Sequence, residues 1–348
     1  MASRLRAQFQ PKELAQVLDA YDIGAVMRID QHLRGSRRSP KVLVTTDQGR
    51  YLLKRRARGR DHPLKVTFAH GVQQHLAARD FPLPRLIPVK DGSDTMVMLD
   101  QQIYELFEYV TGDHYDKSAE ATADAGRVLG LLHKCLSSYQ FDWEPSSRGY
   151  HDISLVRTHL NDIPATVGKD DSVVGKESEL LSTVTGLYDA YEAAAEQVSQ
   201  GGYSALPHQI VHADWHPGNM LFRGGRVTAV IDYDSLRLQP AITDLANGML
   251  QFSILGGPID PREWPAELDE DRLSEFISGY EQEFPIEADL LGLLPSLMIE
   301  ALIAEAVMPI AATGSFGRLE GFRFLKMILR KVRWLEQNGS RLMAEVQV

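Results

Sequence analysis

The residues with the clearest chemical meaning lie in one stretch, IVHADWHPGNMLFRGGRVTAVIDYD, which runs from Ile210 to Asp234. It places His212, Asp214 and Asn219 close together, with a Pro-Gly pair directly before the asparagine. Proline and glycine favour a tight turn, so the Asp214 and Asn219 side chains can share one pocket. A carboxylate in such a pocket can accept a proton or a hydrogen bond from a bound hydroxyl group.

A second carboxylate follows an expected strand. Residues Val227–Ile231 form an apolar run typical of a short buried strand, and Asp232 comes directly after it. Amide and carboxylate oxygens are ligands that suit Mg²⁺. Phosphoryl transfer from ATP needs a metal site and a group that holds the acceptor hydroxyl in line. The pattern therefore predicts this reaction, and the simpler alternative is a polar turn whose side chains cap a helix.

The motif H-A-D-W-H-P-G-N followed by I-D-Y-D resembles the catalytic and metal-binding segments of the aminoglycoside phosphotransferase and choline kinase superfamily. Within it, the segment most resembles homoserine kinases of type II and stress-response kinases. The resemblance implies an α+β, two-lobed, protein-kinase-like fold. Residues 1–110 would form a small antiparallel β-sheet lobe that binds ATP, and residues 111–348 a larger, mainly helical lobe for catalysis and substrate binding.

The same resemblance implies roles for individual residues. Asp214 would be the catalytic base, and Asn219 and Asp232 would hold Mg²⁺. His212, also assigned to the catalytic loop, would brace it. Asp234 stands where many of these kinases carry glycine or a second acid, so it could reach the metal or the substrate.

The N-terminal third contains a candidate phosphate-binding lysine. Strands are expected at Val26–His32, Lys41–Thr46 and Tyr51–Arg56, and the glycine between the last two predicts a hairpin. Lys54 lies on the third strand, where a protein-kinase-like fold places the lysine that pairs with the α- and β-phosphates. A solvated lysine is the alternative.

The loop between the first two strands contains Gly35 and Ser36, whose backbone amides could contact phosphates. It lacks the repeated glycines of a protein-kinase loop. Many arginines surround it, which fits either a solvated hairpin face or a polyphosphate ligand. Nucleic acid fits less well, because no aromatic residues are interleaved with the basic ones.

The expected helix after the lysine strand departs from the kinase pattern. It has the sequence PLKVTFAHGVQQHLAARD, without the glutamate that normally pairs with the lysine. His70, Gln73, Gln74 and His75 are its available polar groups. With the phrase FPLPRL after it, the helix is similar to spore-coat-associated kinase-like proteins. Either a neutral group orients Lys54 or the nucleotide site is altered.

Two functional hypotheses follow. The first is an ATP- and Mg²⁺-dependent kinase that phosphorylates a hydroxyl of a small molecule. The second is a non-catalytic or weakly active kinase-like nucleotide-binding protein. The complete set of Asp214, Asn219 and Asp232 favours the enzyme, since an inactive relative has no need to keep all three in order.

The connection between the lobes is expected after two strands, Thr95–Leu99 and Ile103–Val110, the second of which ends in F-E-Y-V-T-G. The resemblance implies that the Glu108 carbonyl and the Val110 amide meet the adenine edge. An ordinary edge strand followed by a turn at Gly112 is the alternative.

Whole-chain properties agree with an ordinary globular protein. The 348 residues are 44% hydrophobic and 24% charged, with a net charge of −10, which argues against general binding to nucleic acid or anionic membranes. A single cysteine, Cys135, predicts a reducing, cytoplasmic compartment. No signal-peptide pattern is expected at the start, and the apolar stretch Leu291–Ala312, broken by prolines and glutamates, predicts buried helices.

The rest of the C-terminal lobe is expected to be mostly helical, with Asp244 bracing the catalytic loop as its counterpart does in the superfamily. The polar segment 140–171 suggests a long loop or a substrate-region insertion. Acidic residues between Asp260 and Asp289 would attract an amine-bearing acceptor or simply form a solvated surface. Homoserine, an amino alcohol such as choline, a sugar, an aminoglycoside and a protein serine all remain open as acceptors, and the oligomeric state is open too.

Overall fold

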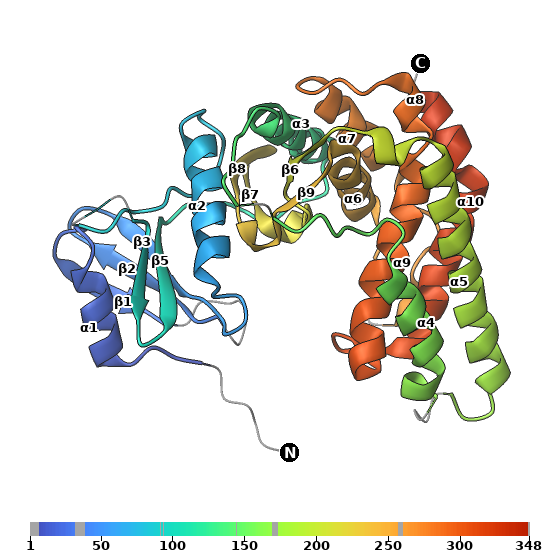
Figure 1. Cartoon of the computed structure of the whole chain (residues 1–348), viewed down its shortest axis with the longest axis horizontal. Helices are drawn as coiled ribbons and strands as arrows, with labels where there is room; N and C mark the ends of the chain where they lie inside the picture. The colour runs from blue at the N-terminus through green and yellow to red at the C-terminus, as the bar shows by residue number, and fades with distance from the viewer. Residues whose placement is uncertain are drawn as a thin grey trace.

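The computed structural model describes residues 7–31, 39–90, 92, 94–143, 145–168, 173–256 and 260–346. A small β-sheet lobe lies at one end and a larger helical lobe at the other, with α2 (Pro63–Ala77) on the side of the sheet that faces the helices (Figure 1). The predicted α+β, two-lobed fold is confirmed. The boundary expected between residues 110 and 111 falls in the segment that links the sheet to α3 (Ala119–Leu136).

The sheet has five antiparallel strands in the order β1-β2-β3-β5-β4. All the expected strands are present within a few residues of their predicted ends. They are β1 (Val26–Asp30), β2 (Lys41–Thr46), β3 (Arg50–Arg55), β4 (Met96–Leu99) and β5 (Gln102–Glu108). Successive side chains of a strand point to opposite faces. One face, with Leu53 and Leu106, packs on α1 (Pro11–Asp19). Lys54 and Glu105, which are cross-strand partners, therefore point to the other face.

The helical lobe is built around α9, which packs against α4, α5, α6 and α10 (Figure 1). The helices not yet named are α4 (Ser154–Val167), α5 (Glu177–Gln200), α6 (Ala241–Ser253), α7 (Glu270–Glu281), α8 (Ala288–Leu291), α9 (Leu294–Thr313) and α10 (Gly321–Val346). Among the described residues, the stretch Ala288–Thr313 alone is long and apolar enough to cross a membrane, but 78% of its apolar 18-residue window is buried in the fold. The expected burial of these helices is confirmed.

Three short antiparallel ribbons complete the helical lobe. They pair β6 (His208–Val211) with β9 (Arg237–Pro240), β7 (Met220–Arg223) with β8 (Arg226–Val230), and β10 (Ser315–Phe316) with β11 (Leu319–Glu320). The first two position the motif that the sequence singled out, because β6 leads into it and the β7–β8 hairpin carries its second half. The backbone N–H of Val230 also donates to the Pro82 carbonyl at 2.9 Å, which ties this hairpin to the chain just after α2.

The expectation of a long loop over residues 140–171 was wrong, because α4 lies within it. Val156, Leu160, Ile163 and Val167 are fully buried and recur at helical spacing. The polar residues between them obscured this apolar stripe, which becomes evident only once α9 covers it. Cys135 is buried on α3, as the sequence predicted.

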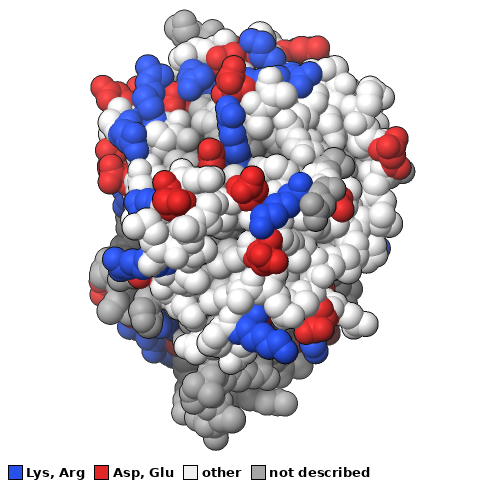
Figure 2. Space-filling view, turned by 90° about the vertical axis from the view of Figure 1, so that its left-hand side faces the viewer, with Lys and Arg blue, Asp and Glu red and all other residues white. Residues whose placement is uncertain are grey.

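The outer end of the sheet lobe carries basic and acidic side chains side by side (Figure 2). Two arginines from the arginine-rich region of the sequence have carboxylate partners: Arg55 pairs with Glu13 of α1, and Arg56 pairs with Glu105. On the visible part of this face the charges are mixed. This face therefore does not form a binding patch of one sign. Arg55 and Arg56, with side chains that are 17% and 3% exposed, are paired inside the lobe and are not part of a solvated surface.

Candidate active site

The loop that carries Asp214 is held by a carboxylate from α6. Asp244 accepts hydrogen bonds from the backbone N–H groups of His212 at 2.6 Å and Ala213 at 2.8 Å. Ala213 has a φ of 59°, a left-handed backbone conformation that is uncommon for alanine and must be stabilised by its surroundings. The bracing role expected for Asp244 is confirmed.

His212 is completely buried beneath this loop. Its ring packs edge-on against Trp215 and Tyr233, with centroid separations of 5.5 and 5.3 Å. Burial lowers the pKa of its imidazole, which favours the neutral ring at pH 7. These contacts fit a bracing role and leave His212 no surface for direct contact with a substrate.

Asp214 and Asn219 lie side by side, as their spacing predicted. The Asn219 amide nitrogen donates to the carboxylate and to the backbone carbonyl of Asp214, both at 3.0 Å. Because both hydrogen bonds use the amide nitrogen, the amide oxygen is available as a metal ligand. The Asp214 side chain is 41% exposed, and His216 Nε2 lies 3.6 Å from its carboxylate. Asp214 can therefore meet a ligand from solvent.

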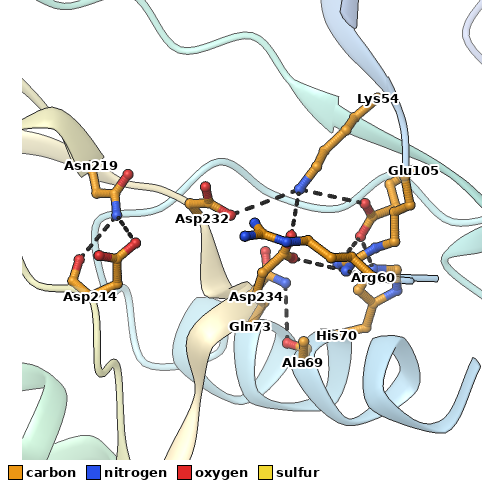
Figure 3. Close-up of polar contacts among 11 residues, drawn as sticks. Lys54, Arg60, Ala69, His70, Gln73, Glu105, Asp214, Asn219, Asp232 and Asp234 are labelled. Carbon is orange, nitrogen blue, oxygen red and sulfur yellow. Dashed lines mark hydrogen bonds and ion pairs between the residues drawn. The ribbon is translucent and has the colours of Figure 1, made fainter. Parts of the chain in front are cut away.

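The β7–β8 hairpin brings Asp232 to the same place. Met220 and Val230 are cross-strand partners, and the Ile231 N–H donates to the Asn219 carbonyl at 2.9 Å. Asn219, just before β7, and Asp232, shortly after β8, thus lie together at the open end of the hairpin (Figure 3). Asp232 has a φ of 68° and a side chain that is 40% exposed. Its carboxylate is directed to the region between Asn219 and Lys54.

Lys54 reaches the same region from the opposite lobe. Its side chain is only 12% exposed, and its Nζ lies 3.3 Å from Asp234, 3.9 Å from Asp232 and 4.0 Å from Glu105 (Figure 3). The structure therefore brings together Lys54 and Asp232, two residues that the sequence analysis assigned separately. It also shows that Lys54 is not an ordinary solvated lysine.

Glu105 is the site residue that the sequence analysis missed. It is fully buried on β5 and contacts Arg56 at 2.8 Å and His70 of α2 at 2.6 Å. Burial opposes its charge, but the hydrogen bond with His70 and the nearby Arg56 and Lys54 hold its pKa far below the usual value. One signal was available: with strands predicted at Tyr51–Arg56 and Ile103–Val110, an antiparallel pairing could have placed Glu105 beside Lys54.

Asp234, whose role the sequence left open, holds cations of the sheet lobe in this structure. It accepts a hydrogen bond from Lys54 at 3.3 Å and pairs with Arg56 at 2.9 Å. Since Asp234 belongs to the helical lobe and both cations belong to the sheet lobe, the contact joins the two lobes beside Asp232.

A cleft of about 540 Å³ lies between the lobes. Its polar end contains the charged cluster of Lys54, Glu105, Asp232 and Asp234, and apolar walls come from both lobes. Glu108 and Val110, expected to meet adenine, line the other end, so that assignment stays compatible with the cleft. Gly35 and Ser36 lie outside the described residues.

A further carboxyl lies on the helical side of Asp214. Glu305 of α9 accepts hydrogen bonds from the Tyr150 hydroxyl at 3.1 Å and the Gln251 amide at 2.6 Å. Burial raises its pKa to about 7, and the charge of Asp214 adds to this effect. This effect of Asp214 on the pKa indicates that the two carboxylates lie in the same part of the helical lobe.

Several carboxylates of the acidic segment between Asp260 and Asp289 have partners away from the cleft. Asp260 pairs with Arg262, Asp269 caps α7 by accepting from the Arg272 backbone N–H at 3.1 Å, and Glu270 pairs with Arg341. These contacts favour the solvated, helix-stabilising interpretation of the segment.

Across the described parts of the chain, no cluster of three or more His, Cys, Asp and Glu residues could hold a metal by itself. The donors near Asp214 fit a different kind of site. Mg²⁺ is commonly held by one or two carboxylates and completed by water and substrate phosphates. An Asn219 amide oxygen and an open Asp232 carboxylate at one hairpin end suit an ion that arrives with a nucleotide.

The sequence of the chain matches a family model described as "Phosphotransferase enzyme family" over residues 31–288. The chain belongs to this phosphotransferase family. The match covers β2 to β5 and the whole loop from His212 to Asp234, so it includes both sides of the cleft.

Individual proteins similar to this chain share 27% or less of their aligned residues with it in the examples that follow. The homoserine kinase of Zymomonas mobilis is 27% identical over 234 residues, which cover 64% of this chain and 64% of that protein. The chain thus matches less than two thirds of the length of this relative. A solved amicoumacin kinase in complex with AMP-PNP, Ca²⁺ and Ami superposes with a TM-score of 0.67 at 16% identity, covering 97% of this chain and 96% of the other.

A microcompartment-associated aminopropanol kinase also has the same fold. Its TM-score is 0.67 at 16% identity, covering 96% of this chain and 98% of that one. At such identities the likeness concerns the fold alone. It agrees with the two-lobed architecture described above.

Proposed function

We propose that this phosphotransferase family member is a kinase that transfers the γ-phosphate of ATP to a hydroxyl of a small molecule, with Mg²⁺ as the metal. One observation carries the proposal: Asp214, Asn219 and Asp232 converge at one end of the β7–β8 hairpin, facing Lys54 across the cleft. The amicoumacin kinase with bound AMP-PNP and Ca²⁺ supports a nucleotide and a divalent ion in this fold.

Each residue of the cleft has a part in this reaction. Lys54 would bind the α- and β-phosphates, while Asn219 and Asp232 would hold Mg²⁺. The bound ion would neutralise the charge that develops on the phosphates. Asp214 would orient the acceptor hydroxyl and accept its proton as the oxygen attacks. Because phosphoryl transfer depends mainly on positioning, the rigid mounting of Asp214 by Asp244 contributes directly.

The acceptor would approach on the side of Glu305 and Tyr150. The relatives named above are kinases of homoserine, aminopropanol and amicoumacin, and the first two of these acceptors are small amines that carry a hydroxyl group. A carboxyl with a pKa of about 7 near Asp214 can accept an ammonium group when it is charged. We therefore favour an amino alcohol or a hydroxyl-bearing amino acid over a neutral sugar.

A non-catalytic nucleotide-binding protein is the second candidate. The observation that favours it is the absence of a glutamate from α2, which separates this chain from the usual kinase pattern. The buried charge cluster around Lys54 weighs against it, because shielded ionisable groups with specific charge partners in a cleft are typical of functional sites.

The proposed function is tested by nucleotide binding followed by turnover. We expect ATP to raise the melting temperature of the protein more strongly with Mg²⁺ than with EDTA. Consumption of ATP is then measured with homoserine, aminopropanol, an aminoglycoside and a neutral sugar. A protein that gains no Mg²⁺-dependent stabilisation and consumes no ATP with any acceptor would support the non-catalytic alternative.

A further inference from the structure

A lysine that binds phosphates needs a partner to fix its direction. Its ammonium group sits on a flexible four-carbon stem, and in protein kinases a helix glutamate holds the corresponding lysine. Helix α2 of this chain has the sequence PLKVTFAHGVQQHLA and contains no acidic residue. A carboxylate that orients Lys54 must therefore come from another element.

The strand next to the lysine strand supplies such a carboxylate. Glu105 is the direct cross-strand partner of Lys54. One of its oxygens, Oε1, is occupied by Arg56 at 2.8 Å and His70 at 2.6 Å. The other, Oε2, is buried, has no hydrogen-bond partner among the described residues, and lies 4.0 Å from the Lys54 Nζ. The unpaired oxygen thus faces the lysine (Figure 3).

We propose that Glu105 is the positioning residue for Lys54 and that it replaces the helix glutamate with a carboxylate on strand β5. This inference rests on the proposed function, because it concerns the binding of ATP phosphates by the same lysine. Glu105 acts through Lys54 and does not touch the nucleotide.

The α2 helix contributes to the position of Lys54 indirectly, through a contact between His70 and Glu105. The His70 ring bridges Thr95 and Glu105. Its Nδ1 lies 2.6 Å from the Thr95 hydroxyl oxygen, and its Nε2 lies 2.6 Å from Glu105 Oε1. Arg56 holds the same carboxylate oxygen from the end of β3. A histidine on the helix therefore fixes the strand carboxylate, which in turn faces the lysine. This order explains why a helix without acidic residues is compatible with a functional lysine.

Arg56 also keeps the cluster neutralised when Lys54 moves. In this structure the Nζ of Lys54 is nearer to Asp234, at 3.3 Å, than to Glu105, at 4.0 Å. If bound phosphates draw Lys54 away from Asp234, Asp234 still pairs with Arg56 at 2.9 Å. Lys54 then keeps Glu105 as its carboxylate partner. No buried carboxylate would lose its last cationic partner, a loss that is costly in a protein interior.

The opposite face of the same sheet provides a matched control. Arg55, the residue between Lys54 and Arg56, points toward α1 and pairs with Glu13, which also accepts a hydrogen bond from Tyr104 at 2.8 Å. The Glu13 side chain is 13% exposed, against 1% for Glu105. Glu13→Gln therefore removes a shielded carboxylate from the sheet lobe without touching the cleft.

The test compares Glu105→Gln with Glu13→Gln in the full chain. Binding of ATP with Mg²⁺ is measured by calorimetry, and kcat and KM for ATP are measured with the best acceptor. For Glu105→Gln we expect kcat/KM for ATP to fall by roughly 10–100-fold, with the KM of the acceptor changed less than about twofold. Glu13→Gln should keep kcat/KM for ATP within about threefold, even if its melting temperature falls equally.

A double-mutant cycle separates positioning from general damage. If Glu105 acts through Lys54, adding Glu105→Gln to Lys54→Ala should lower kcat/KM for ATP by less than about threefold more. The inference is overturned if Glu105→Gln alone stays within twofold of wild type, if Glu13→Gln loses as much, or if the two cleft substitutions are fully additive. Nucleotide affinity keeps the test valid for a protein without turnover, because Glu105→Gln should still weaken ATP binding more than Glu13→Gln.

Discussion

The two sides of the cleft are built in different ways. On the helical side, Asp214, Asn219 and Asp232 lie within one short stretch of sequence and are joined by a hairpin. On the sheet side, Lys54 depends on Glu105 from β5 and Asp234 from the helical lobe, which are far from it in sequence. The first arrangement is local and conforms to a motif. The second is a buried charge network assembled by tertiary structure. In such a network, the carboxylate that pairs with the lysine can come from different secondary-structure elements.

The largest expected effect tests the local side. Asp214→Asn removes the proposed acceptor of the hydroxyl proton while preserving the size of the side chain. We expect kcat to fall by about 10²–10⁴-fold, with ATP affinity within about threefold of wild type. Steady-state kinetics and calorimetry measure the two quantities. Full turnover by this variant would remove Asp214 from the role of base and would contradict the local arrangement.

The proposed metal ligand on the same side is tested by Asp232→Asn. The loss of one negative charge at the proposed Mg²⁺ site should lower kcat/KM for ATP by roughly 10²–10³-fold at fixed Mg²⁺, and added Mg²⁺ should restore part of it. A titration of rate against Mg²⁺ concentration measures this. The matched control is Asp113→Asn, an exposed aspartate in the linking segment, which should leave the Mg²⁺ requirement unchanged.

The loop brace is tested by its contribution to stability. Asp244→Ala leaves the buried N–H of His212 and the neighbouring N–H of Ala213 without an acceptor, and each lost hydrogen bond is costly. We expect the free energy of unfolding to fall by about 2–3 kcal/mol, measured by urea denaturation. Ser118→Ala removes an ordinary helix cap from α3, where the Ser118 hydroxyl accepts from the Ala121 N–H at 3.2 Å, and should cost about 1 kcal/mol. Equal losses from both variants would argue against a special brace.

The last prediction concerns Glu305 and is seen only in the pH dependence of stability. Its pKa is raised to about 7 from 4.5, so the folded chain keeps this proton at pH values where the unfolded chain has lost it. The contribution of Glu305 to the free energy of unfolding therefore falls as the pH rises through this window. Glu305→Gln lacks this fall, and its stability relative to wild type should rise by about 3 kcal/mol between pH 4 and pH 8.

Urea denaturation of both proteins at several pH values measures this difference. A constant difference across the range would show that the carboxyl titrates alike in the folded and unfolded chains. That outcome would also weaken the proposed contact between Glu305 and an ammonium group of the acceptor.

Much of the fold was accessible from the sequence because it depends on local patterns. Alternation of apolar residues predicts the strand at Lys41–Thr46, and helical spacing predicts the long helices. The glycine at position 49 predicts the hairpin turn. Helix α4 was missed because its apolar stripe is narrow and is buried by α5 and, more extensively, by α9. Its presence depends on a partner more than a hundred residues away.

The chemistry divides in the same way. The sequence alone determined that Asp214, Asn219 and Asp232 form a set, since a turn and a hairpin keep near neighbours close in space. Only the tertiary structure decided what holds Lys54. A buried ammonium group requires a carboxylate, but any element that reaches it can provide one, and here β5 and the loop after β8 do so in place of α2. The spacing of residues along the chain does not predict a contact of this kind.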